Sequence, residues 1–319
     1  MKRALITGIN GQVGSYLAEF LLGKGYEVWG MYRRSSTPKF QNISQIIHKM
    51  NLVEGDLLDV GSLYRVLKES QPDEVYNLAA LAHVGVSWHQ PALTGEINGL
   101  GVVNLLDAIV QVKPDAKFYQ ASSSELFGST EEDPKNEATP MYPVSPYGVA
   151  KLYAHKMVRS YRDVHNLFAV GGICFNMDSP RRGEDSASRK IAKGAARIKL
   201  GLEKDLHMGN LASIRDWGFA GDYVEAMWLM LQQEEPEDFV VATGVGHSVK
   251  EFCQAAFSKV GLDWEKYVKV DSGLLRPVDV SPMTGDASRI GKKLGWKPKT
   301  SFEELVGIMV DAELSAARN

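Results

Sequence analysis

A tyrosine and a lysine four residues apart, Tyr147 and Lys151, are the first residues of this chain whose spacing indicates chemistry. They stand in SPYGVAKLY, a stretch with a helical pattern, and residues i and i+4 share one face of a helix. A free tyrosine has a pKa of about 10 and is a poor base at neutral pH. A cation one helical turn away, together with a positively charged nicotinamide, favours the phenolate. The pair therefore indicates redox chemistry at a hydroxyl.

The same spacing occurs a second time, at Tyr64 and Lys68 in YRVLK. The order of elements along the chain separates the two copies. Tyr64 precedes the fourth predicted strand, on a helix expected to cover a sheet, so we expect it to be structural. Tyr147 follows the fifth predicted strand, where a helix can bring its side chain over a nicotinamide.

Three hydroxyl side chains and an acid end the fifth predicted strand, in QASSSELFG. The carboxyl ends of parallel strands open into the ligand crevice, so Ser123 and its serine neighbours are placed to hold a sugar hydroxyl. A plain serine-rich turn is the alternative. Glu125 is more informative, because oxidation of a hydroxyl needs only tyrosine, lysine and serine. An additional carboxylate suits removal of a carbon-acid proton beside a new ketone, which is what a dehydratase requires.

The elements that must position these residues follow an alternating pattern through the first half of the chain. Strands are predicted at 4–8, 26–32, 49–56, 74–80, 116–123 and 168–175, with helices between them, including ones near 60–70 and 95–111. Such alternation predicts an α/β fold with a doubly wound parallel (Rossmann) sheet. The rhythm breaks after residue 175. We therefore predict a cofactor-binding Rossmann domain at 1–175 and a smaller, interleaved substrate-binding lobe at 176–319, with a helix at 188–200.

Three glycines stand between the first predicted strand and the first predicted helix. Gly8, Gly11 and Gly14 form GxxGxxG in GINGQVG. A glycine triad alone is weak evidence, but a strand before it and a helix after it are the context that a dinucleotide site requires. The glycines let the backbone approach a pyrophosphate, which binds at the helix N-terminus.

The end of the second predicted strand favours NADP over NAD. An acid at this place binds the ribose hydroxyls of NAD, whereas an arginine accommodates a 2′-phosphate. The chain has Arg33 and Arg34 there and no acid; Glu27 lies at the other end of the strand. A solvated pair of arginines is the alternative interpretation. Asp56, after the third strand, is placed either to bind the adenine amino group or to cap a turn.

Composition sets the broad class of protein. Of 319 residues, 44% are hydrophobic and 24% charged, which is typical of a soluble enzyme, and the net charge of −3 argues against a nucleic-acid binder. Cys174 and Cys253 match no disulfide or zinc spacing and are predicted to be buried. We predict no metal site, no membrane-spanning stretch and no signal peptide, and hence a cytoplasmic protein.

Taken together, these motifs resemble the GDP-mannose 4,6-dehydratase family of extended short-chain dehydrogenases/reductases. The resemblance runs from Lys2 to about Glu313 and includes RALITGINGQVGSYLAEFLL, QPDEVYNLAA, FYQASSSELFG, SPYGVAKLY, SPRRGE and RDWGFAGDYVEAMWLMLQQ. It implies that Tyr147 takes the C4 hydroxyl proton as hydride leaves C4 for NADP⁺. It also implies that Glu125 removes the C5 proton and assists loss of the C6 hydroxyl, that Ser123 binds at C4 and that Lys151 orients Tyr147 and the nicotinamide ribose.

The resemblance also implies ligand contacts and partners. A dimer or tetramer is implied, because the family uses the segment after Arg33 and Arg34 to reach a neighbouring subunit. The second lobe is expected to bind the GDP part of a GDP-sugar. The cofactor-binding set is Gly8, Asn10, Gly11, Gln12, Val13, Gly14, Arg33, Arg34, Ser35, Asp56, Leu57, Leu78, Ala79, Ala80, Tyr147, Lys151, Met177 and Arg182. The substrate-binding set is Ser87, Ser123, Glu125, Tyr147, Asn176, Lys190, Gly209, Asn210, Arg215, Arg276 and Asp279.

The chain departs from the family pattern at several of these places. Serine at 123 replaces threonine and keeps the hydroxyl. The other departures are Met177-Asp178 for His-Glu, Asp279 for glutamate, Leu81-Ala82 for Gln-Ser and Val13 for aspartate. An altered sugar such as a heptose, or a different base, would accompany such changes. A reductase or epimerase of a related GDP-sugar is the main rival, and a non-enzymatic NADP-binding sensor is the rival from another class.

Overall fold

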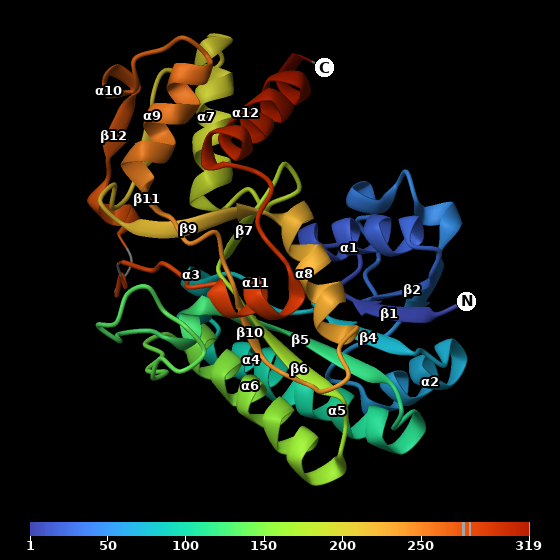
Figure 1. Cartoon of the computed structure of the whole chain (residues 1–319). Coiled ribbons are helices and arrows are strands. Elements are labelled where there is room, and N and C mark those ends of the chain that lie inside the picture. The colour runs from blue at the N-terminus through green and yellow to red at the C-terminus, as the bar shows by residue number, and fades with distance from the viewer. Residues whose placement is uncertain (276–277, 281, 319) are drawn as a thin grey trace.

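A parallel β-sheet forms the centre of the computed structural model, which describes residues 1–275, 278–280 and 282–318 (Figure 1). Seven strands lie in the order β10-β6-β5-β4-β1-β2-β3, and every neighbouring pair is parallel. Their bounds are β1 Arg3–Thr7, β2 Glu27–Tyr32, β3 Asn51–Glu54, β4 Glu74–Asn77, β5 Lys117–Ser123, β6 Ala169–Cys174 and β10 Phe239–Val241. The predicted doubly wound sheet is confirmed, and all six strands expected in the first half form.

Helices cover both faces of this sheet, because each helix has an apolar stripe that must be buried. On one face, α1 (Gln12–Gly23) packs against α8 (Ala220–Leu231). The other face is covered by α2 (Val60–Ser70), α5 (Gly101–Val112) and α6 (Pro146–His165). Tyr64 packs against the core beneath α2, which is the structural position predicted for it.

The two halves of the chain are interleaved in space. Strand β10, the seventh of the sheet, and helix α8 both come from the second half but complete the layers built by the first. β10 was not predicted, because three residues are too short to show a period. The division at residue 175 stays a prediction.

The rest of the second half forms a smaller lobe above the carboxyl ends of the strands (Figure 1). Its sheet contains β11 (Gly246–Ser248), β9 (Ile214–Phe219) and β7 (Asn176–Asp178), and β8 (Leu206–Met208) pairs with β12 (Val268–Val270). Helices α7 (Ala187–Lys199), α9 (Val249–Lys259) and α12 (Phe302–Arg318) share one apolar core. Short helices α10 (Trp264–Tyr267) and α11 (Ser288–Leu294) complete the lobe and the sheet edge. Cys174 and Cys253 are buried and unpaired, as predicted.

One helical run differs from expectation. Helix α4 (Pro91–Gly95), the π-helical turn η3 (Glu96–Leu100) and α5 follow one another directly, and Pro91–Val112 is long and apolar enough to cross a membrane. We had expected no such stretch. Half of its most apolar window is buried inside the molecule, and α5 packs against α2 and α6. Packing of this kind is that of a core helix.

Candidate active site

A cavity of about 1010 Å³ opens at the carboxyl ends of β1, β4 and β5, with the second lobe as its far wall. Most predicted site residues line it, although they come from distant parts of the chain. They are Gly8, Asn10, Gly11, Gln12, Val13, Gly14, Arg33, Ser35, Asp56, Leu57, Leu78, Ala79, Ala80, Ser123, Glu125, Tyr147, Lys151, Asn176, Met177, Arg182, Gly209, Asn210, Arg215 and Asp279.

Three predicted site residues lie away from the wall of this cavity. Arg34 and Lys190 are exposed on the surface. Ser87 is buried in the short helix α3 (Val84–Ser87), where its hydroxyl donates to the Val84 carbonyl at 2.6 Å, so its side chain is already bonded within its own helix. Arg276 lies outside the described residues.

In the glycine loop, the backbone at Gly14 lies close to the backbone at Gly8. Gly8 has a φ of +68°, and a Cβ on Gly14 would lie 2.4 Å from the Gly8 carbonyl oxygen, so neither position accommodates a side chain without movement. Helix α1 then begins at Gln12 with no side-chain cap and no acid in its first turn. Its free amides and its dipole suit an anion, and the loop therefore fits the pyrophosphate of a dinucleotide.

A buried hydrogen-bond chain fixes the next segment of the cavity wall. The Thr7 hydroxyl donates to the Asn77 side-chain oxygen at 2.6 Å and accepts from the amides of Leu78 and Ala79 at 3.1 and 3.0 Å. Asn77 in turn donates to Gln120 at 2.8 Å. Three neighbouring strands thus hold the loop after β4 in one position. Sequence reasoning missed Thr7 and Gln120, which lie inside apolar strands.

Asn98 holds the same loop further along. It sits in the π-helical turn η3, is almost fully buried, and bonds the Leu81 backbone twice, accepting from its amide at 2.8 Å and donating to its carbonyl at 3.0 Å. Such turns are frequent at functional sites. No pattern in the sequence signals this contact.

The residues predicted to select and bind the cofactor differ in the contacts that they already make. Arg33 lines the cavity directly after β2, whereas Glu27, at the start of that strand, is engaged with Arg3 at 3.0 Å. Asp56 lines the cavity and also accepts from the Leu58 amide at 2.9 Å, so it caps a turn as well. The end of β2 therefore presents a cation and no acid to a bound ribose.

Helix α6 positions the tyrosine and the lysine. The Ser145 hydroxyl caps it by accepting from the Gly148 amide at 3.0 Å, and Pro146 opens its first turn. Tyr147 and Lys151 are both buried and line the cavity. The Lys151 ammonium lies 5.8 Å from the centre of the Tyr147 ring and donates to the Ala121 carbonyl at 2.9 Å.

Burial favours the neutral form of both side chains. It raises the pKa of Tyr147 to about 12, an effect that the Ser123 hydrogen bond and the Arg182 charge oppose and the Glu125 charge strengthens. Burial lowers the pKa of Lys151 to about 8. The two pKa values are set by the same dry environment, which also strengthens the interaction of the ammonium with any phenolate that forms during the reaction.

Ser123 and Glu125 stand where β5 ends beside the start of α6. The Ser123 hydroxyl accepts from the Glu125 amide at 3.2 Å and caps the turn η4 (Ser124–Leu126). A Cβ on Gly148 would lie 2.7 Å from the Glu125 carbonyl, so only glycine lets the helix approach this turn so closely. The arrangement places a carboxylate, a hydroxyl, a phenol and an ammonium on one cavity.

A buried serine–histidine pair lies behind these groups. The Ser122 hydroxyl is 2.9 Å from His155 Nδ1, one helical turn beyond Lys151 on α6, and burial lowers the pKa of His155. Gly171 leaves room for this ring. The pair ties β5 to α6 at the residue between Ala121 and Ser123. Sequence reasoning considered Ser122 but gave His155 no role.

On the far wall, one carboxylate organises several polar groups. Asp279 accepts from Asn210 at 2.8 Å, from Ser213 at 3.2 Å and from Arg215 at 2.6 Å. Burial raises its pKa, but the Arg215 charge and these hydrogen bonds outweigh that effect and lower it. Arg215 is itself almost buried. The cluster is a rigid polar surface suited to hydroxyl and amide groups of a ligand.

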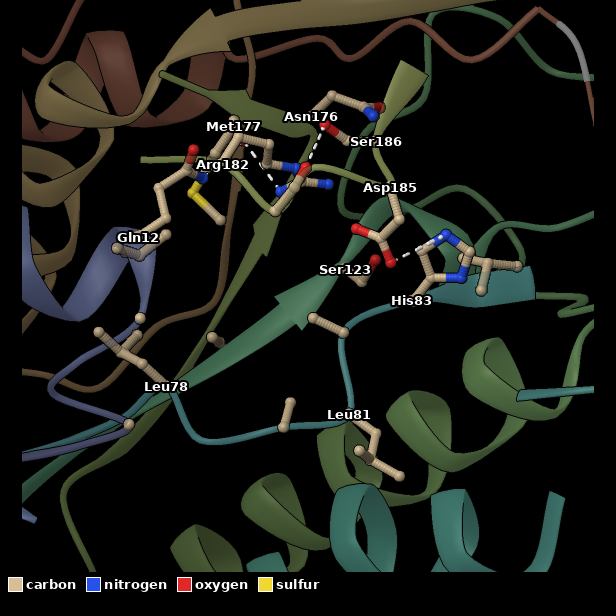
Figure 2. Close-up of a pocket in the computed structure, with 18 of the residues that line it drawn as sticks. Gln12, Leu78, Leu81, His83, Ser123, Asn176, Met177, Arg182, Asp185 and Ser186 are labelled. Carbon is tan, nitrogen blue, oxygen red and sulfur yellow. Dashed lines mark hydrogen bonds and ion pairs between the residues drawn. The ribbon is translucent and has the colours of Figure 1, made fainter. Parts of the chain in front are cut away.

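The two lobes are joined beside the glycine loop. Gln12 donates to the Met177 carbonyl at 2.9 Å and accepts from Ser179 at 2.8 Å, while Arg182 donates to the same carbonyl at 3.1 Å (Figure 2). Arg181 pairs with Glu19 of α1 at 2.7 Å. Both arginines of SPRRGE line the cavity, and Arg182 also lies 3.5 Å from the Asp178 carboxylate.

A doubly wound sheet, a glycine loop before α1 and a tyrosine–lysine pair on one helix define the extended short-chain dehydrogenase/reductase class. A profile of the GDP-mannose 4,6 dehydratase family matches residues 5–309. GDP-mannose 4,6 dehydratase 2 of Arabidopsis thaliana is 51% identical over 99% of this chain and 88% of its own length, and the human enzyme 47% identical over 99% and 92%. The chain belongs to the GDP-mannose 4,6-dehydratase family. The structure of Thermus thermophilus UDP-glucose 4-epimerase in complex with NAD superimposes with a TM-score of 0.87, at 30% identity over 98% of this chain and 99% of that one.

Proposed function

We propose that this protein is an NADP-dependent hydro-lyase that converts GDP-mannose to GDP-4-keto-6-deoxymannose. The observation that carries the proposal is the position of Glu125. Its carboxylate can act as a second base, beside Tyr147, on the cavity that also holds Ser123 and Lys151. The family and the names of the relatives agree with this reaction.

In the oxidation at C4, Tyr147 removes the hydroxyl proton. Ser123 donates to or accepts from the same oxygen, which keeps it within reach of the phenol. Lys151 holds its charge beside the phenolate, and its bond to Ala121 fixes the ammonium in place. When bound, the nicotinamide accepts hydride from C4 and returns it to C6.

In the elimination, Glu125 removes the C5 proton, which the new ketone has made acidic. The same carboxyl group then protonates the departing C6 hydroxyl, so that the carbon–oxygen bond breaks and water leaves. Tyr147, which has held the C4 hydroxyl proton since the oxidation, then supplies a proton to C5. The sugar loses one water and the cofactor ends as it began.

The cofactor assignment rests on Arg33. Its charge lies on the cavity after β2, where a 2′-phosphate of NADP would be held and where the chain has no acid to bind the ribose of NAD. The substrate assignment rests on the far wall, where Arg182 and Arg215 suit a diphosphate and the Asp279 cluster suits a ribose or base. We further propose a cytoplasmic dimer or tetramer, with residues 1–175 as the NADP-binding part and 176–319 mainly as the GDP-sugar-binding part.

Glu125→Gln tests the role of the second base. The variant should bind NADPH as the wild type does, because residue 125 lies away from the glycine loop, but it should form no 4-keto product from GDP-mannose. Glu131→Gln, which changes an exposed acid six residues later, is the matched control and should retain full activity. Full product formation by Glu125→Gln would refute the proposed role. Stoichiometric consumption of NADPH by the wild type would instead favour the rival reductase.

A further inference from the structure

A histidine and a carboxylate from the two lobes meet across the cavity. His83, on the loop after β4, places Nε2 3.4 Å from a carboxylate oxygen of Asp185, on the loop that precedes α7 (Figure 2). Both residues line the cavity that holds Ser123 and Tyr147. The mechanism proposed above assigns neither of them a role.

The local backbone is shaped to hold this pair. A Cβ on Gly85 would lie 2.8 Å from the His83 ring, and a Cβ on Gly183 would lie 2.9 Å from the Asp185 carboxylate. Each side chain thus occupies space that its neighbouring glycine leaves open. His83 Nδ1 accepts from the Val86 amide at 3.0 Å, so the proton of the ring is on Nε2 and faces Asp185.

The contact between His83 and Asp185 orients the carboxylate but uses only part of its capacity to accept hydrogen bonds. The Asp185 side chain is 60% exposed and that of His83 39%, and a carboxylate has acceptor positions for several donors. His83 fills one of them. A negative charge is poorly suited to a diphosphate, whereas it is well suited to the hydroxyl groups of a neutral sugar. The arginines that suit a diphosphate, Arg182 and Arg215, lie elsewhere on the same wall.

We propose that Asp185, oriented by His83, binds a hydroxyl group of the hexose and makes the site select a nucleotide that carries a sugar. The inference rests on the proposed function for the nature of the ligand. The carboxylate accepts a hydrogen bond from the sugar, and His83 holds it in place from the opposite lobe. Sugar binding therefore joins the two lobes through this pair.

Affinity for GDP-mannose and for GDP, measured by calorimetry on the NADP-loaded protein, tests this proposal. The cofactor is loaded in its reduced form, which cannot take hydride from C4, so that the sugar is not consumed. Asp185→Asn should weaken GDP-mannose binding about tenfold to a hundredfold, the usual effect of losing a hydrogen bond to a charged group, and should leave GDP binding within about twofold. His83→Asn keeps a cap for the Val86 amide and should weaken GDP-mannose binding in the same direction.

The controls separate this proposal from a general effect on the loop. Glu184→Gln changes the adjacent acid, which pairs with Lys193 at 2.9 Å and does not line the cavity, and should alter neither affinity. Equal weakening of GDP and GDP-mannose by Asp185→Asn, or no weakening of either, would overturn the inference. The proposed function fails separately, if the wild-type enzyme leaves GDP-mannose unchanged.

Discussion

Replacing Lys151 with methionine should make the protein more stable while it destroys activity. Burial holds the pKa of this lysine at about 8, well below its ordinary value of 10.5. At 1.36 kcal/mol per pKa unit, keeping the ammonium charged in the fold costs about 3 kcal/mol near neutral pH. Methionine fills a similar volume and carries no charge, so Lys151→Met removes this cost.

The pH dependence makes the prediction specific. The unfolded chain binds the lysine proton more tightly than the folded chain does, so unfolding takes up a proton between the folded and unfolded pKa values. The stability of the wild type therefore rises with pH in that window, and the cost falls from about 3 kcal/mol at pH 7.5 to about half of that at pH 9.5. Lys151→Met lacks this change. Groups that do not interact with Lys151 cancel in the difference.

Urea unfolding followed by tryptophan fluorescence at these two pH values measures the effect. The advantage of Lys151→Met over the wild type should shrink by about 2 kcal/mol between pH 7.5 and pH 9.5. Lys68→Met changes the exposed lysine of the look-alike YRVLK stretch and should show no such change. A difference between Lys151→Met and the wild type that is the same at both pH values would refute the assignment of a depressed lysine pKa.

Three further predictions concern the cofactor side and the pH profile. Gly14→Ala should destabilise the protein by roughly 1–3 kcal/mol and weaken NADPH binding in a fluorescence titration, whereas Gly23→Ala, whose Cβ meets nothing within 4 Å, should be neutral or slightly stabilising. Arg33→Ala should weaken NADP binding about tenfold or more and leave NAD binding nearly unchanged; equal loss of both would contradict the role of Arg33. Wild-type kcat should fall as the pH rises above about 8, because Lys151 then loses its proton, and a flat profile to about pH 10 would argue against that charge.

The parts of the site that follow from local sequence were predictable. The glycine loop is recognised from three evenly spaced glycines between a strand and a helix, and the place of Tyr147 after β5 separates it from Tyr64. Both signals are local because each motif lies in one short stretch of chain, the turn from β1 into α1 or the first turns of α6. The parallel sheet followed from the alternation of short apolar runs with helical patterns.

The remaining parts depend on contacts between residues far apart in the chain. Asn98 bonds Leu81 through a π-helical turn, and a π-turn has no sequence signature. Asp185 and His83 meet only because the second lobe folds back over β4. Ser87 shows the limit of a family pattern. The pattern assigns this residue to the substrate site, but its hydroxyl is bonded inside its own helix.

Incubation of the purified protein with GDP-mannose and a catalytic amount of NADP in D₂O tests the central claim most directly. The expected product has lost one water and carries one solvent deuterium at C5, because the original C5 proton leaves with the C6 hydroxyl as water and an exchangeable proton replaces it. The nicotinamide absorbance should show no net change. Unchanged GDP-mannose, or a product formed with stoichiometric oxidation or reduction of the cofactor, would contradict the claim.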